Sequence, residues 1–588
     1  MRTPRGSEVA RNNISMGWGN FRWLAGWGLS AFFIVFFVVG FLLTKDHLSG
    51  AMQELFTLNL VPDSSLPPTL DFEAAHRRQE RDFVLLGLGL AAVAGVGAAV
   101  LVDWYWISLF SRQEEDLEEE TFLRGTQKSG VAELNARIEE EGLDGDLRLG
   151  EALLPVGMED RSLLITGSQG TGKSTLIMQL MDAIETRHDG VVTYDKTGGY
   201  VRAYYTPERG DIILNPFDDK GAIWNPWAEG ENYESIAESL IPENPQADPF
   251  WPSSARKILV ALLKRVRTNQ QLAYAIDQLD PKAMAKLLEG DGATRVLAES
   301  EMAASVLATL ATAVGCFSYL KDGDGAFSLR TWIKEGRAGW IFLTCPQAYQ
   351  ERIKPLISLW FDLLSKGLLE REERSDGPRT WFVLDELASL QALPSLPNLL
   401  AEGRKYRGAV VLGFQTMAQV EHIYAEKQAR AIAATCRTKV FLATEEEYTA
   451  EWISKTIGDQ EIEELKESLS MGPSENRDGV SLSRQVRTRR AVMAAEIMNL
   501  PDLTAFLKLH GGYPVCLIKL IPCQRPDRMK ALEERKRLAD LQRLEHRPIL
   551  LLPAPTDSGL EDRVVRAPSV VPPAQSVVSA QLAEEGWE

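Results

Sequence analysis

The sequence contains few of the residues that bind transition metals or form disulfides. Its 588 residues include only six histidines, and its five cysteines show no CxxC pair and no metal-ligand spacing. The cysteines are Cys316, Cys345, Cys436, Cys516 and Cys523. This pattern argues against a zinc site, and it indicates the reduced thiols of a cytoplasmic protein.

The sequence also lacks an excess of basic residues. Its formal net charge of −18 argues against general, charge-driven binding to nucleic acid. A local basic groove or pore remains compatible with this charge, because binding follows the local potential. A chain of this length is too long for one ordinary core, and about three or four structural units are expected.

Two long uncharged runs occupy the N-terminal part of the chain, at residues 23–43 and 83–102. Each is long enough to cross the hydrocarbon core of a membrane as a helix. The alternatives are a signal peptide for the first run and a buried core helix for the second. The first run is longer than the apolar stretch of about 7–15 residues in a signal peptide. We therefore predict a membrane anchor over residues 1–110.

Small residues recur along the second run. Gly87, Ala91, Gly95 and Ala99 are spaced by four residues, which places them on one face of a helix. Such a face lets another membrane helix approach closely. Two spans leave both termini on one side of the membrane, with residues 44–82 as a loop on the other. The positive-inside bias of the flanking residues is slight.

Residues 111–588 divide into segments that differ in composition and in hydrophobic pattern. Residues 111–150 are polar and contain the acidic run EEDLEEE, which predicts a solvated linker. Residues 151–230 and 327–520 alternate short apolar runs with helical segments, as in an α/β domain with a largely parallel sheet. Residues 231–326 have helical periodicity and predict an all-α insertion. In residues 521–588 we expect an amphipathic helix over Arg525–Arg547 and a disordered, proline-rich tail.

Eight strands are predicted in the α/β part. They lie at 162–166, 191–194, 211–214, 339–344, 381–384, 409–413, 439–443 and 514–519.

A phosphate-binding motif follows the first of these strands. The residues after the apolar SLLIT fit G-x-x-x-x-G-K-[ST] in full and open a helical run, which is the context the motif requires. The predicted nucleotide-binding residues are Gly167, Ser168, Gln169, Gly170, Thr171, Gly172, Lys173, Ser174 and Thr175. In such a loop the backbone amides surround the phosphates, the lysine neutralises phosphate charge, and the serine supplies an oxygen to Mg²⁺. The sequence therefore predicts ATP and Mg²⁺ as cofactors.

An acidic partner for this loop follows the apolar run WFVL. Asp385 is expected to hold Mg²⁺ together with Ser174, and Glu386 is expected to be the base that orients or deprotonates water. An apolar run followed by two acidic residues is weak evidence alone. Paired with the phosphate loop it becomes strong evidence for a hydrolase.

Two further residues are candidates for catalysis. Gln415 follows the next strand, where P-loop motors often carry a sensor of the γ-phosphate. The alternative is a glutamine that merely caps a strand end. Arg404 lies just upstream and is our candidate for a cation that acts in a neighbouring subunit, although a solvated basic turn explains it nearly as well. The rival cations are Arg407, Arg437 and Arg161.

With these residues placed, the chain resembles the type IV secretion coupling proteins, in particular their TraD-like conjugation branch. The resemblance rests on two spans before the phosphate loop and on a helical insertion between Lys173 and Asp385. It rests most of all on the continuous text FVLDELASLQALPSLPNLLAEGRKYRGAVVLGFQTMAQVEHIYA, Phe382–Ala425. Further matches are Asn215–Trp227, Asp248–Leu259 and Ala494–Leu503.

The resemblance implies a hexameric, RecA-like motor in the bacterial inner membrane. Such a motor recruits a relaxase-bound single strand of DNA and uses ATP to pump it into the secretion channel, without reading its sequence. The helical insertion would face the cytoplasm and meet the substrate. The basic run at Arg484, Arg487, Arg489 and Arg490 is a candidate for DNA contact, although a solvated surface explains it better. The alternative functions are an FtsK-like DNA translocase and a coupling ATPase that delivers proteins only.

Overall fold

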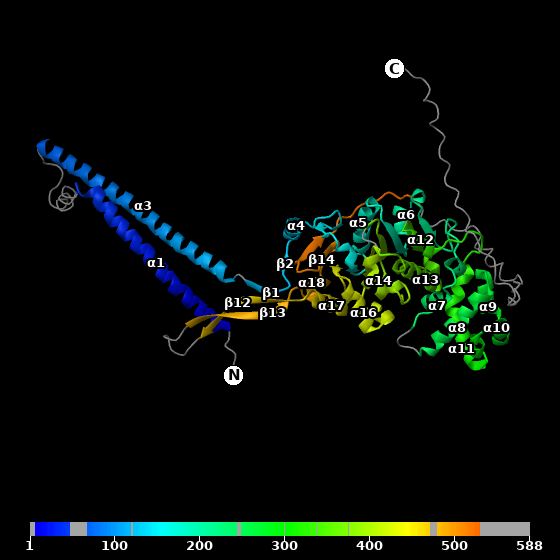
Figure 1. The fold of residues 1–588 in the computed structure, drawn as a ribbon. Coiled ribbons are helices and arrows are strands. Elements are labelled where there is room, and N and C mark those ends of the chain that lie inside the picture. The colour runs from blue at the N-terminus through cyan, green and yellow to red at the C-terminus, as the bar shows by residue number, and fades with distance from the viewer. Residues whose placement is uncertain are drawn as a thin grey trace, which may run out of the picture. The chain divides into compact units, whose positions relative to one another are not determined.

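The structure is a computed structural model. It describes residues 6–47, 68–118, 121–243, 248–298, 300–336, 338–373, 376–470 and 479–529. The chain forms two compact units, Met1–Arg124 with Glu461–Arg489, and Gly125–Gln460 with Arg490–Glu588. The first unit contains two long apolar helices and a small sheet, and the second contains a large sheet covered by helices (Figure 1).

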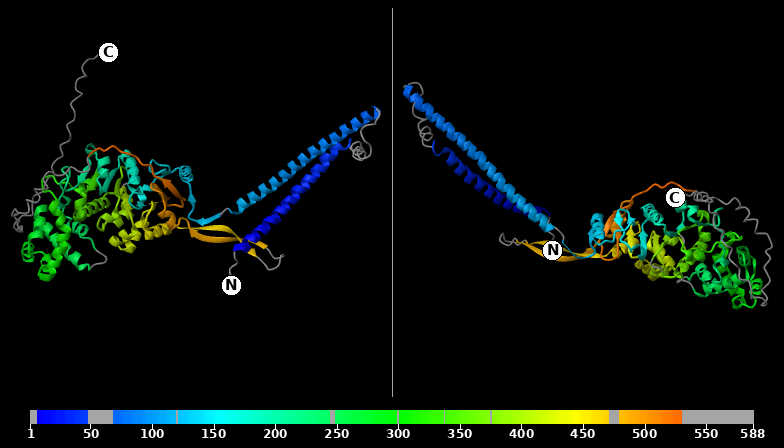
Figure 2. Two further views of the ribbon diagram at one scale, coloured as in Figure 1. Left: turned by 180° about the vertical axis from the view of Figure 1, so that it is seen from behind. Right: turned by 45° about the horizontal axis from the view of Figure 1, so that its top comes forward.

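The two long helices of the first unit are α1 (Gly6–Thr44) and α3 (Pro68–Glu118). They lie side by side in every view (Figure 1 and Figure 2). Their segments Ala25–Thr44 and Arg78–Tyr105 are long and apolar enough to cross a membrane, with mean hydropathies of 2.3 and 2.4. Both predicted spans fall on these segments. Many of their large apolar side chains are exposed, which suits a surface that faces lipid.

Small residues form the contact between these two helices. Ala91 of α3 is fully buried, and a Cβ added to Gly40 of α1 would lie 3.6 Å from Ala91 Cβ. A Cβ at Gly95 would lie only 2.8 Å from Phe32 Cδ2, which is too close for two carbon atoms. The predicted small-residue face of the second span is therefore confirmed as the face that packs on α1.

A small sheet in the first unit was not expected from the sequence. Its strands are β1 (Thr121–Gly125), β12 (Asp459–Ser470) and β13 (Gly479–Arg490), in the order β1-β12-β13. Arg484 Nη1 lies 3.4 Å from Glu463 Oε2, and Arg487 Nη1 lies 3.8 Å from Glu464 Oε2. The basic run considered for DNA contact thus lies on an exposed strand, where these two arginines are paired with carboxylates of β12.

A ten-stranded sheet forms the centre of the second unit. Its order is β2-β15-β14-β11-β5-β10-β9-β6-β8-β7. Neighbouring strands from β11 to β7 are parallel, whereas β14 is antiparallel to both β11 and β15. The strands are β2 (Lys128–Ser129), β5 (Leu163–Thr166), β6 (Gly190–Asp195), β7 (Ile212–Leu214), β8 (Trp340–Thr344), β9 (Thr380–Leu384), β10 (Gly408–Phe414), β11 (Thr438–Phe441), β14 (Thr504–Lys508) and β15 (Val515–Lys519).

All eight predicted strands are present, with boundaries that differ by at most a few residues. The sequence did not reveal β2 and β14, which are short strands at one end of the sheet. A two-stranded sheet of β3 (Arg148–Leu149) and β4 (Ala152–Leu153) was also not predicted.

The sheet has a core on each of its faces, because alternate strand residues point to opposite sides. Leu164 and Leu412 pack on one face, in the same cluster as Trp360 of α13. Leu163 and Ile165 pack on the other face with residues of α4 and α5. The helices in the second unit outside the segment from β7 to β8 are α4 (Val131–Glu140), α5 (Lys173–Thr186), α6 (Gly199–Tyr204), α13 (Gln350–Leu369), α14 (Leu396–Glu402), α15 (Met417–Tyr424), α16 (Glu426–Thr435), α17 (Glu447–Ile457) and α18 (Ala494–Met498).

The described residues between β7 and β8 form helices and no strand. They are α7 (Tyr233–Leu240), α8 (Phe250–Arg265), α9 (Asn269–Gln278), α10 (Pro281–Leu287), α11 (Ser300–Val314) and α12 (Leu329–Glu335). The segment Met302–Tyr319 is also long and apolar enough to cross a membrane, but Val306 and Leu310 are buried in the core that covers one face of the sheet. The structure does not separate this helical region from the rest of the second unit.

The prediction of a solvated linker at residues 111–150 is wrong. Helix α3 continues to Glu118, β2 joins the edge of the large sheet beside β15, and α4 packs on the core. Leu134 and Ile138 of α4 are fully buried. Their spacing of four residues forms an apolar stripe along the helix, which the high charge of the segment concealed.

The start of the predicted C-terminal helix is also wrong. Residues 521–529 contain no helix and run along α5 instead. Arg525 Nε donates to Asp182 Oδ1 at 2.8 Å, and Arg528 Nη2 donates to Glu185 Oε2 at 2.9 Å. These ion pairs favour the extended path over a helix. The rest of the predicted helix and the proline-rich tail lie outside the described residues.

Candidate nucleotide-binding site

The loop between β5 and α5 contains the predicted phosphate-binding motif. Gly170 and Gly172 have φ angles of +85° and +114°, a region that glycine enters with little strain. The loop is held from outside by Leu503, whose N–H donates to the carbonyl of Thr171 at 2.9 Å. A Cβ at Gly172 would lie 2.9 Å from Leu503 Cδ2, so this position also needs glycine for space. Helix α5 begins directly after the loop, so its first amides are available to an anion.

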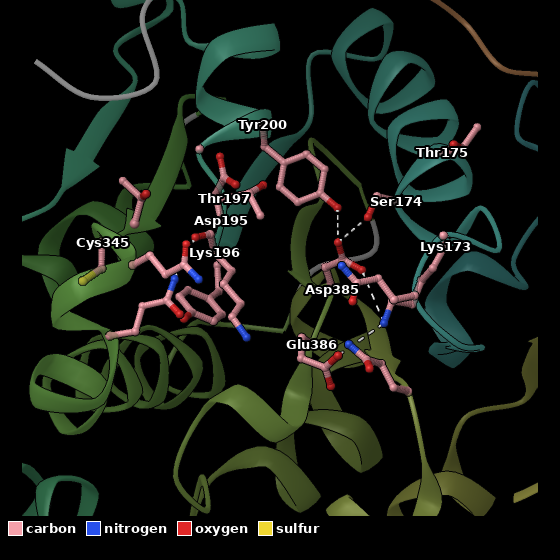
Figure 3. Close-up of a pocket in the computed structure, with 18 of the residues that line it drawn as sticks. Lys173, Ser174, Thr175, Asp195, Lys196, Thr197, Tyr200, Cys345, Asp385 and Glu386 are labelled. Atoms are coloured by element: carbon pink, nitrogen blue, oxygen red, sulfur yellow. Dashed lines mark hydrogen bonds and ion pairs between the residues drawn. The ribbon is translucent and has the colours of Figure 1, made fainter. Parts of the chain in front are cut away.

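The two predicted acidic residues lie beside this loop (Figure 3). Asp385 and Glu386 follow the C-terminal end of β9. Ser174 Oγ donates to Asp385 Oδ2 at 2.7 Å, although 211 residues separate them in the chain. Lys173 Nζ lies 3.4 Å from Glu386 Oε2 and 3.9 Å from Asp385 Oδ1. The fold therefore brings together the lysine, the hydroxyl and the two carboxylates.

A cavity of about 780 Å³ opens over these groups. This volume lies within the range of roughly 300–1,000 Å³ that is usual for small-molecule sites. The remaining walls come from residues at or after the ends of β6, β7, β8 and β9, from Gln347 and Gln350, and from Gln415. The phosphate loop contributes Ser168, Gln169, Gly170, Gly172, Lys173, Ser174 and Thr175 to the lining. Gly167 and Thr171 support the loop through hydrogen bonds to Phe414 and Ser168.

The remaining two candidates lie at opposite ends of the central strand β10. Gln415 follows β10 and lines the cavity beside Glu386. Arg404 lies in a short 3₁₀ helix (Gly403–Tyr406) that precedes β10, and it is exposed. Because β10 runs parallel to the phosphate-loop strand β5, Arg404 lies near the N-terminal ends of these strands, whereas the cavity lies at their C-terminal ends.

Sequence reasoning missed two residues of the cavity wall, Tyr200 and Asp195, which make hydrogen bonds at the site. Tyr200 OH donates to Asp385 Oδ2 at 2.8 Å, and burial raises the pKa of Tyr200 well above its usual value. Asp195, the last residue of β6, accepts a hydrogen bond from the N–H of Val201 at 2.8 Å. The signal in the sequence was an acidic residue at the end of a strand, followed closely by Gly198 and Gly199.

The oxygen atoms of the site suit Mg²⁺. Asp385 Oδ1 and Glu386 Oε1 are buried and have no hydrogen-bond partner. Hydroxyl and carboxylate oxygens are the ligands that Mg²⁺ prefers, and it is often held by only one or two carboxylates together with phosphates and water. Across the described ranges, no group of three or more His, Cys, Asp or Glu forms a metal cage. The residues therefore fit a nucleotide-bound Mg²⁺ rather than a metal held by protein alone.

Replacing Gly413 by alanine should disturb this site. The added Cβ would lie 2.2 Å from the carbonyl oxygen of Asp385, so β10 or Asp385 must move. We expect a stability loss of about 1–3 kcal/mol, as for other overpacked cores, together with weaker Mg²⁺-dependent nucleotide binding. Thermal unfolding and a binding titration measure the two effects. Gly315→Ala is the control, because a Cβ at Gly315 meets no atom within 4 Å, and equal behaviour of the two variants would contradict the account.

Replacing Asp195 by asparagine should change how stability depends on pH. Burial raises the pKa of Asp195 to about 6, from 3.8, against the opposing effect of nearby amides. A raised carboxyl pKa contributes stability that is present below pH 3.8 and is lost as pH rises through about 6. Relative to the native chain, the variant should therefore gain about 3 kcal/mol between pH 3.8 and 7. Unfolding temperatures compared across that range test this, and a constant difference would contradict it.

Comparison with known proteins finds one family model that covers most of the described second unit. The model for the type IV secretion-system coupling protein DNA-binding domain matches residues 147–521. The coupling protein TraD of Escherichia coli K12 is 32% identical over 456 residues, which are 74% of this chain and 63% of TraD. The conjugal transfer protein TraG of Rhizobium radiobacter is 25% identical over 364 residues, which are 56% of this chain and 55% of TraG. The chain thus spans less than two thirds of either relative.

Solved structures of a plasmid coupling protein resemble this chain. The bacterial conjugative coupling protein TrwBdeltaN70 superimposes with a TM-score of 0.64 at 29% identity, covering 71% of this chain and 97% of that one. TrwB in complex with ADP and Mg²⁺ gives a TM-score of 0.62 at 28% identity, covering 71% and 98%. These matches confirm the predicted α/β, RecA-like fold around the phosphate loop.

Proposed function

The chain belongs to the type IV secretion-system coupling proteins, and from that premise we propose that it is a membrane-anchored ATPase of conjugation. Its work is to recruit a relaxase-bound single strand of DNA and pump it into a type IV secretion channel. The observation that carries this proposal is the juxtaposition of Lys173, Ser174, Asp385 and Glu386 at one cavity. That set serves hydrolysis and not binding alone.

The residues take the following roles with ATP. The amides of the phosphate loop and Lys173 would hold the β- and γ-phosphates of ATP, and Ser174 and Asp385 would hold Mg²⁺, which would supply positive charge beside the phosphates. Glu386 accepts a proton from the attacking water at its carboxylate. Gln415, at the cavity wall, senses the γ-phosphate.

A neighbouring subunit completes the site in this proposal. A second cavity of about 730 Å³ adjoins Glu386 and Gln415 and is also lined by Lys196. It offers space for a cation from another copy of the chain. Arg404 is exposed and remote from its own cavity, as a residue that acts in trans must be. A homo-hexamer that encloses the strand fits this arrangement.

The membrane topology is also part of the proposal. The segments Ala25–Thr44 and Arg78–Tyr105 cross the bacterial inner membrane, and both termini lie in the cytoplasm with the nucleotide site. The helical region at 231–326 acts as an all-α insertion that meets the substrate. The partners of the protein are the relaxase on the DNA and the proteins of the secretion channel. The strand passes through a narrow channel in which a few cations per subunit contact phosphates, so the acidic balance of the chain is no obstacle.

The test is ATP hydrolysis by the full chain in lipid nanodiscs, measured against protein concentration with and without DNA. We expect single-stranded DNA to raise turnover several-fold, with a steep dependence on protein concentration from subunit assembly. Stimulation by secreted proteins and by no DNA would support delivery of proteins only. A preference for double-stranded DNA would support an FtsK-like translocase.

A further inference from the structure

The carboxylate of Asp385 is held by two hydroxyl groups on one of its oxygens. Ser174 Oγ donates to Oδ2 at 2.7 Å, and Tyr200 OH donates to the same atom at 2.8 Å. The two donors come from different elements, because Ser174 lies on α5 and Tyr200 lies on α6. Figure 3 shows both hydroxyls directed at Asp385.

The other oxygen of Asp385 is left for a ligand. Asp385 Oδ1 is buried and has no hydrogen-bond partner, and Lys173 Nζ lies 3.9 Å from it. The torsion that rotates a carboxylate has broad minima, so the side chain alone does not fix which oxygen faces the cavity. Two donors on Oδ2 fix it, and they leave Oδ1 free of hydrogen bonds on the side of Lys173.

Ser174 also serves the metal. Its hydroxyl is the group that the phosphate loop offers to Mg²⁺ through an oxygen lone pair, while its O–H can still donate to Asp385. Tyr200 has no such second task. It is 4% exposed, and its ring is fixed in the wall of the cavity.

The backbone around Tyr200 is also built to hold it in place. Asp195 accepts a hydrogen bond from the N–H of Val201, the residue that follows Tyr200. Gly198, with φ of +75°, turns the chain into α6.

We propose that Tyr200 is a positioning residue for the divalent cation, because its hydroxyl orients Asp385 so that Oδ1 faces the water shell of the nucleotide-bound Mg²⁺. This rests on the proposed function of the site as a Mg²⁺-dependent nucleotide site. Tyr200 touches neither phosphate nor metal in this arrangement. It acts only through Asp385.

Tyr200→Phe removes the hydroxyl and keeps the ring. Binding of the fluorescent nucleotide mant-ADP to the full chain, titrated with Mg²⁺, measures the effect. We expect the Mg²⁺ concentration for half-maximal enhancement to rise by about tenfold, the lower end of the effect of losing a partner of a metal ligand. Affinity for mant-ADP in EDTA should stay within about a factor of two, because Asp385 contributes to nucleotide binding through the metal.

Tyr204→Phe is the matched control. Tyr204 is buried on the same helix, and its hydroxyl donates to Met178 O at 2.8 Å and Asp182 Oδ1 at 2.7 Å instead of to a residue of the site. It should leave the Mg²⁺ midpoint unchanged.

Three results would overturn the proposal. In the first, Tyr200→Phe has a native Mg²⁺ midpoint. In the second, its affinity falls equally with Mg²⁺ and with EDTA, which would indicate a general packing role. In the third, the two tyrosine variants behave alike. A native chain that binds mant-ADP with no response to Mg²⁺ would instead refute the Mg²⁺ dependence of the nucleotide site, on which the proposal depends.

Discussion

Replacing Lys173 by alanine should weaken nucleotide binding by about 10²–10³-fold and bring hydrolysis below detection. In the structure Lys173 is 9% exposed and is the cation that lies between the phosphate loop and two carboxylates. Its removal leaves Asp385 and Glu386 without a countercharge beside the position of the γ-phosphate. A loss of 10²–10³-fold corresponds to about 3–4 kcal/mol, which lies within the range of about 2–5 kcal/mol for truncating one partner of a buried charge pair at a binding site.

The measurement is equilibrium binding of a fluorescent ATP analogue together with phosphate release. Lys455→Ala is the control, because Lys455 is an exposed lysine on α17 that lines no cavity described above. DNA transfer by cells that carry Lys173→Ala should fall to the background level. Normal DNA transfer by this variant would show that transfer does not need this nucleotide site.

Replacing Glu386 by glutamine should separate binding from hydrolysis. Glu386 Oε2 lies 3.4 Å from Lys173 Nζ. In the nucleotide-free chain Glu386 is therefore paired with the lysine that the phosphates of ATP would bind. Glutamine removes that competition and one negative charge, and ATP should bind at least as tightly as to the native chain. Loss of the base should lower turnover by about 10²–10⁴-fold.

Single-turnover hydrolysis and ATP binding, measured on the same preparation, distinguish the two effects. Glu139→Gln makes the same change at an exposed position of α4 and should alter neither quantity. Near-native turnover by Glu386→Gln would refute its role as the base. Weaker binding of ATP would refute the competition for Lys173.

The parts of the fold that follow from local pattern were predictable. Apolar runs bounded by turns located the parallel strands, and the phosphate loop and Asp385 were found because each occupies a fixed place at the end of a strand. The small-residue face of α3 was equally predictable, since the spacing of Gly87, Ala91 and Gly95 alone determines it.

Other features depend on contacts between distant segments, and no local pattern indicates them. Tyr200 follows an ordinary Gly-Gly turn, and only the fold brings its hydroxyl to Asp385, 185 residues later. The strands β12 and β13 have charged sequences that suggest a solvated surface, yet ion pairs such as Arg484 with Glu463 join them. The segment at Arg525 was predicted to be helical from its own periodicity, and its pairing with Asp182 decides otherwise.

The central claim is that hydrolysis at this site moves a single strand of DNA. The most direct measurement is ATP-driven displacement of streptavidin from single-stranded DNA that carries biotin at either end, by the full chain in nanodiscs. The account predicts displacement from one end with ATP, none with a non-hydrolysable analogue, and none by Glu386→Gln. DNA-stimulated hydrolysis without displacement from either end would contradict it.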